Sequence, residues 1–144
     1  MLRAVLDTNV FVSSLLNKNG APARLLDAWR AGKYLPATSP PIIAEIKAVL
    51  ESAHISKKYA LASQDIRRLL DLLQKDTLLV PGVSRVDNTI PQDPTDEIFL
   101  SCALDAKADA IVSGDHHLLI LKAFEGIPIM TVRRFLDRID RVSI

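Results

Sequence analysis

Short apolar runs alternate along the chain with stretches in which apolar residues recur at helical spacing. The runs are bounded by turn residues and are typical of buried parallel strands. They predict strands at residues 2–6, 34–37, 77–80, 109–112 and 127–130. The helically spaced stretches predict helices at residues 21–31, 39–52, 63–75, 94–107, 115–122 and 131–139. Because strands and helices alternate, the pattern predicts a mainly parallel sheet covered on both faces, with a long loop at residues 80–92.

Polar residues follow the first and the fourth predicted strands directly. Asp7-Thr8-Asn9 comes after the first, and Ser113-Gly114-Asp115 comes after the fourth. In open α/β sheets, ligands bind in the crevice outside the carboxyl ends of the strands. A carboxylate at either place is therefore a candidate for a functional site, although Asp115 could equally be the cap of the next helix.

Two further acids lie on predicted helices. At 100° per residue, Asp96 is roughly 20° from Ala103, inside an apolar arc where a solvated carboxylate is not expected. The alternative is a capping motif, with Asp93 as the cap and Asp96 in the first turn near the positive end of the helix dipole. Glu45 lies at the edge of the apolar stripe of its helix, where it could lean over a cleft or be an ordinary glutamate at the rim.

The four acids, in this order, resemble those of the PIN-domain family of metal-dependent ribonucleases, and within it the small toxins of the VapC kind. The resemblance covers nearly all of the 144 residues. Asp7-Thr8-Asn9 is similar to the first acidic motif, Glu45 to the second acid, and Ser113-Gly114-Asp115 to the fourth. Asp96 matches the third acid, and the residues after it match the family's helix. The resemblance implies a single domain over residues 1–144, with a three-layer α/β/α fold and a mainly parallel sheet of about five strands.

The resemblance also implies the roles of the site residues. Asp7, Glu45, Asp96 and Asp115 are the expected catalytic residues, and the three aspartates among them are the expected metal ligands. The residues expected to orient them are Thr8, Asn9, Asp93 and Ser113. Clustered carboxylates repel one another unless a cation is present, and oxygen ligands favour Mg²⁺ or Mn²⁺ over zinc. We therefore expect hydrolysis of RNA by a water that the metal activates, with no covalent enzyme intermediate.

Charge and composition limit how RNA could be held. The formal net charge is only +1 and the pI is about 7.9, so RNA must be bound by local patches. Candidate RNA-binding side chains, each of which could equally be an ordinary surface charge, are Lys18, Arg24, Arg85, Arg133 and Arg134. Aromatic residues make up 5% of the chain, so base stacking is not the expected main source of affinity.

Cysteine usage and hydropathy bear on the compartment. Cys102 is the only cysteine, which excludes an internal disulfide and a zinc site with several cysteines. No apolar run approaches the roughly 18 residues of a membrane span, and no signal peptide precedes the first strand. These features favour a cytoplasmic protein that does not enter a membrane.

VapC-like toxins typically form homodimers and are inhibited by a small antitoxin, so the resemblance implies both partners. An exposed apolar stripe is expected at such an interface. The candidates are the helices with Leu69, Leu72 and Leu73 or with Phe135, Leu136 and Ile139, unless both pack on the sheet.

Other functions remain alternatives. A housekeeping RNA-processing nuclease would share the four acids and need no antitoxin. An inactive PIN module that only binds a partner would not need to keep all four. A haloacid dehalogenase-type phosphatase is disfavoured, because Asn9 stands where that family has a second acid.

Overall fold

A six-stranded sheet lies at the centre of the computed structural model, which describes residues 1–83 and 97–142, apart from the side chains of Ala53, His54, Ser56 and Val142. The strands are β1 (Arg3–Leu6), β2 (Leu35–Thr38), β3 (Leu78–Leu79), β4 (Ala110–Val112), β5 (Ala123–Phe124) and β6 (Ile127–Met130). Their order is β3-β2-β1-β4-β6-β5, and all neighbours are parallel except β5 and β6. The mainly parallel sheet is therefore confirmed.

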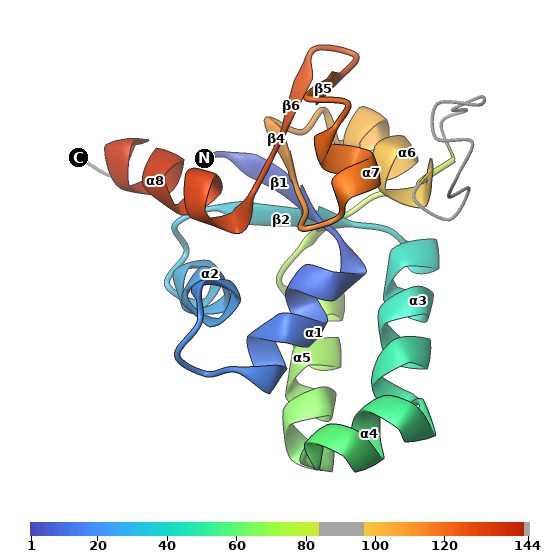
Figure 1. Cartoon of the computed structure of the whole chain (residues 1–144). Helices are drawn as coiled ribbons and strands as arrows, with labels where there is room; N and C mark the ends of the chain where they lie inside the picture. Colours follow the sequence, from blue (N-terminus) through green and yellow to red (C-terminus); the bar gives the residue numbers. More distant parts are fainter. Residues whose placement is uncertain (84–96, 143–144) are drawn as a thin grey trace.

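Helices cover both faces of this sheet. They are α1 (Thr8–Leu16), α2 (Ala21–Arg30), α3 (Pro40–Glu51), α4 (Ala53–Tyr59), α5 (Ser63–Lys75), α6 (Glu97–Ala106), α7 (His116–Leu119) and α8 (Val132–Val142). In Figure 1, α6 and α7 lie on one side of the strands, and α1, α2 and α5 lie on the other. The chain adds β2 and β3 on one side of β1 and then β4, β6 and β5 on the other. The last helix, α8, returns to the face of α2 and packs against it. The expected three-layer α/β/α architecture is confirmed.

The register of the central strands brings several polar residues to one edge of the sheet. Leu6 of β1 is paired with Val112 of β4, which in turn is paired with Met130 of β6. The ladder continues one residue further, since Asp7 N–H donates to the Val112 carbonyl at 3.1 Å and Ser113 N–H to the Met130 carbonyl at 3.0 Å. Asp7 and Ser113 therefore stand side by side at the carboxyl edge of the sheet.

Three elements were not predicted from the sequence. Helix α1 is rich in β-branched residues, serine and asparagine, which favour a helix weakly, so its formation depends on its cap and its burial. Helix α4 is a short segment capped by Ser52. Strand β5 pairs with β6 through a two-residue turn in which Glu125 and Gly126 both have positive φ, as a tight hairpin requires. The predicted loop at 80–92 and the start of the predicted helix at 94–107 lie largely outside the described residues.

Both apolar stripes considered as interfaces pack in the protein instead. Leu69 and Leu73 of α5 and Phe135 and Ile139 of α8 are buried in the core. The ring of Phe135 packs edge-on against Tyr34, with 5.2 Å between ring centroids. Only the half-buried Leu72 and Leu136 remain at the surface, so the expectation of an exposed stripe on these helices is wrong. Over the described residues, no helix is long and apolar enough to cross a membrane.

Candidate active site

Asp7 stands at the junction between β1 and α1 and is the N-cap of that helix. Its Oδ1 atom accepts a hydrogen bond from the Val10 N–H at 3.0 Å, which satisfies one of the free donors of the first turn. The residue is only 3% exposed. The strand therefore delivers the carboxylate to the sheet edge, and the helix that begins there holds its orientation.

Ser113 connects Asp7 with Asp115. Its hydroxyl donates to Asp7 Oδ2, while its Oγ accepts from the Asp115 N–H at 2.9 Å. Ser113 is fully buried at the end of β4. The Ser113 hydroxyl therefore restrains the Asp7 carboxylate, and its role in a functional site stays a prediction.

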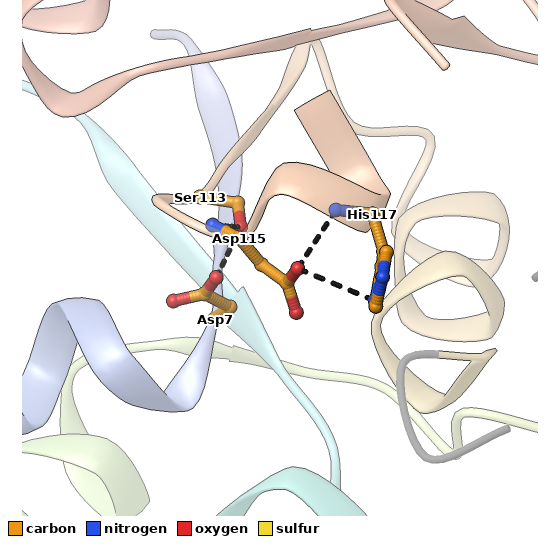
Figure 2. Close-up of polar contacts among 4 residues, drawn as sticks. All are labelled: Asp7, Ser113, Asp115 and His117. Atoms are coloured by element: carbon orange, nitrogen blue, oxygen red, sulfur yellow. Dashed lines mark hydrogen bonds and ion pairs between the residues drawn. The ribbon is translucent and has the colours of Figure 1, made fainter. Parts of the chain in front are cut away.

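Asp115 caps the short helix α7 and is more open to solvent than Asp7. Its Oδ1 atom accepts from the His117 N–H at 2.8 Å and lies 3.8 Å from the His117 Nδ1 atom. Figure 2 shows the two carboxylates projecting from neighbouring strand ends, with the His117 ring beside Asp115. The capping role that the sequence offered as an alternative is thus real, but it leaves the second carboxylate oxygen free of a protein donor among the described residues.

Burial raises the pKa of Asp7 above its ordinary value of 3.8, and the negative charge of Asp115 raises it further. Hydrogen bonds from Ser113 and from the Val10 and Gly114 amides act in the opposite direction and are outweighed. Because the two carboxylates repel each other and Asp7 is poorly solvated, a cation bound between them would be stabilised.

Glu45 reaches the same region from another helix. It lies halfway along α3, and its Oε2 atom accepts a hydrogen bond from the hydroxyl of Thr8, the residue after Asp7. Thr8 is buried in the first turn of α1, whereas Glu45 is half-buried. This hydrogen bond holds Glu45, the second expected acid, close to Asp7, the first.

Three predicted site residues, Asp93, Asp96 and Arg85, lie outside the described residues. Within the described part of the chain, no group of three or more histidine, cysteine or acidic residues could hold a metal ion. Asn9 is exposed on α1, and its side chain has no hydrogen-bond partner among the described residues, so its orienting role stays a prediction.

The basic candidates fall into two groups. Lys18 follows the far end of α1, about 14 Å along the helix from its cap, and lines a surface pocket with residues of α2 and α5. Arg24 lines a pocket between α2 and α8. Arg133 and Arg134 are exposed in the first turn of α8, directly after the strand that ends beside β4. Of the two groups, only Arg133 and Arg134 lie close to the sheet edge that carries Asp7. RNA binding by any of these side chains stays a prediction.

The sequence interpretation missed two features of this edge. Asp7 was not expected to cap a helix, although an aspartate three residues before the buried Val10 is an N-cap signal. Thr38 ends β2 beside β1, and its buried hydroxyl has no hydrogen-bond partner among the described residues. The sequence does not indicate whether the hydroxyl of a threonine at a strand end has a hydrogen-bond partner.

Comparisons with known proteins agree with the fold. The chain is 31% identical over 121 residues to an uncharacterized protein of Methanocaldococcus jannaschii, covering 84% of this chain and 76% of that protein. A chain of the VapBC2 structure from Rickettsia felis, solved bound to a DNA fragment from the promoter, superposes with a TM-score of 0.60. That likeness covers 90% of this chain and 98% of the other at 15% identity, and therefore concerns the fold.

A family model described as the PIN domain matches residues 3–117, which is most of the chain and includes the elements that carry Asp7, Glu45 and Asp115. PIN domains are generally nucleases, and these nucleases generally use divalent metal ions. The chain belongs to the PIN-domain family.

Proposed function

We propose that this chain is an endoribonuclease that hydrolyses RNA phosphodiester bonds with Mg²⁺ or Mn²⁺, and that it is the toxin of a toxin–antitoxin pair. The observation that carries the nuclease proposal is the set of contacts at the sheet edge. Ser113 is hydrogen-bonded to both Asp7 and Asp115. Thr8, the residue after Asp7, is hydrogen-bonded to Glu45. Carboxylates from three separate elements are thus held toward one edge, where α/β proteins bind their ligands.

The donors fit a hard divalent cation. Asp7 and Asp115 offer carboxylate oxygens, which Mg²⁺ and Mn²⁺ prefer, and Asp7 has a raised pKa because it is buried next to a second negative charge. We propose Asp7 and Asp115 as ligands, together with Asp96 beyond the described residues. When bound, the ion would lower the pKa of the attacking water and neutralise charge on the phosphoryl oxygens.

The protein side chains do the positioning. Ser113 fixes the rotation of the Asp7 carboxylate and, through the backbone, the start of the loop that carries Asp115. Thr8 donates to Glu45 Oε2 and so holds this half-buried carboxylate at the same edge. Glu45 is therefore proposed to orient the attacking water and to take up its proton as the P–O bond forms.

The most direct assay uses purified protein, a mixture of cellular RNAs and controlled metal ions. We expect cleavage with Mg²⁺ or Mn²⁺, none after chelation with EDTA, and recovery when the ion is added back. Cleavage that continues at full rate in EDTA would contradict a metal-dependent mechanism. Absence of cleavage of any RNA with either ion would instead favour an inactive PIN module that only binds a partner.

A separate observation supports the toxin assignment. The likeness to a chain of VapBC2 supports it at the level of the fold. We propose a small antitoxin that covers the acidic edge, and a homodimer of this chain. Expression without the antitoxin should arrest growth, and Asp7→Asn should relieve the arrest. Harmless expression of a protein that cleaves RNA would favour a housekeeping nuclease, while light scattering that detects only monomers would remove the dimer.

A further inference from the structure

Planar rings are scarce on the described surface of this protein. Five aromatic side chains are buried, namely Phe11, Trp29, Tyr34, Phe99 and Phe135, and Phe124 is half-buried. Tyr59 is 43% exposed but stands at the end of α4, which is far from the strand ends in Figure 1. The remaining exposed rings of the described residues are His116 and His117, directly after Asp115.

The first turn of α7 places His117 next to Asp115. Because the His117 N–H donates to Asp115 Oδ1, the acid and the histidine are held on the same side of the first turn of α7. The ring stands beside the Asp115 carboxylate in Figure 2, and its side chain is 48% exposed. The His116 ring does not cover it, since the two centroids are 6.3 Å apart and the planes are tilted by 54°. The exposed part of an imidazole is therefore accessible next to the proposed site.

We propose that His117 is a stacking platform for an unpaired nucleobase next to the scissile phosphate. The inference rests on the proposed ribonuclease activity and assigns a substrate-binding residue to it. The faces of a base are available to a side chain only where the base is not stacked in a helix, and histidine is among the residues on which such bases stack. A duplex would present its backbone to Asp115 and leave the His117 ring without a partner.

Base stacking would add to the RNA affinity of a chain whose net charge is only +1. Exposed arginines supply attraction to any phosphate, which does not distinguish paired from unpaired strands. Stacking on a ring beside the acid adds a contact that only the unpaired strand makes.

Binding is best measured by fluorescence anisotropy with Mg²⁺ and a short single-stranded RNA, using Asp7→Asn to prevent cleavage. Adding His117→Ala should weaken binding about tenfold, the size of a typical base–ring contact, and His117→Phe should restore it. The backbone N–H that caps α7 is retained in both variants. Tyr59→Ala, which removes an exposed ring elsewhere, should bind like the parent. Binding of duplex RNA should be unaffected by any of these changes.

In the active protein, His117→Ala should raise KM about tenfold and change kcat by less than about twofold, because the ring binds substrate and does not react. Unchanged affinity and KM in His117→Ala would overturn the platform, as would His117→Phe behaving like alanine. Either result would leave the nuclease standing if the parent protein still cleaves. Equal weakening of duplex and single-strand binding in His117→Ala would also overturn the platform.

Discussion

The Ser113 hydroxyl donates a hydrogen bond to the Oδ2 atom of Asp7 across two neighbouring parallel strands. The Ser113 Oγ atom also accepts from the Asp115 N–H, so one buried serine controls the orientation of one acid side chain and the backbone of another. This arrangement follows from register, since the residues after Leu6 and Val112 must stand side by side once those two are paired.

Replacement of Ser113 by alanine should therefore impair the nuclease without removing a metal ligand. We expect a loss of about 10–100-fold in activity at low Mg²⁺, the usual effect of removing a group that orients ligands, with partial recovery at high Mg²⁺. A magnesium titration of the cleavage rate measures this. Ser14→Ala is the matched control, because Ser14 is also buried but donates within its own helix to the Phe11 carbonyl at 2.6 Å. If both variants require the same Mg²⁺ concentration as the parent, Ser113 does not orient the site.

Asp7→Asn should raise the melting temperature of the protein in EDTA at pH 7. The folded-state pKa of Asp7 lies above the ordinary 3.8, so its ionisation destabilises the fold, and this loss develops as the pH rises through the folded-state pKa. The amide removes the charge and still caps α1, because asparagine is an equally good N-cap. The gain should disappear well below pH 3.8, where the parent is protonated too, and Mg²⁺ should stabilise the parent more than the variant. Thermal melts across pH that show a parent more stable than the variant at pH 7 in EDTA would refute this explanation.

Gly82→Ala should destabilise the protein more than Gly126→Ala. Both glycines have positive φ, +69° and +80°, so alanine at either costs about 1 kcal/mol in backbone energy. At Gly82 the new Cβ would also lie 2.7 Å from Ser39 Cβ and 2.9 Å from its Oγ, whereas nothing lies within 4 Å at Gly126. Ser39 is the cap of α3, the helix that carries Glu45.

We expect about 1–3 kcal/mol of additional destabilisation in Gly82→Ala, measured by urea denaturation. Equal unfolding free energies for the two variants would mean that residue 82 does not pack against the cap of α3.

Thr38→Val should stabilise the protein by about 1 kcal/mol, because it replaces a buried hydroxyl that has no partner among the described residues with a methyl group of similar size. Thr38→Ser keeps the hydroxyl and loses a methyl group, so it should be destabilising. Denaturation midpoints of the two variants separate these effects. A destabilised valine variant would show that the hydroxyl does find a hydrogen-bond partner in solution.

The sheet could be predicted from the sequence because its strands are short apolar runs with few other structures open to them. Helix α1 could not, because Val10, Phe11 and Val12 favour a strand locally and become helical only once Asp7 caps them and the core buries them. The positions of Asp7 and Asp115 at the sheet edge could be predicted, because each residue comes shortly after a predicted strand. Their connection through Ser113 depends on how β1 and β4 are aligned, and the sequence of a single strand does not specify this register. The link between Thr8 and Glu45 spans 37 residues and required the packing of α3 beside α1.

The central claim is that Asp7 belongs to the reacting centre and does more than cap α1. Single-turnover RNA cleavage at saturating Mg²⁺ tests it most directly, comparing Asp7→Asn with Asp27→Asn, a change of the same chemistry at an exposed position of α2. We predict that Asp7→Asn, folded by circular dichroism, loses more than about 100-fold in rate, since groups that merely orient ligands already cost 10–100-fold. Asp27→Asn should cleave like the parent. A folded Asp7→Asn protein that cleaves at the parental rate, or equal losses in both variants, would contradict the assignment of this edge as the active site.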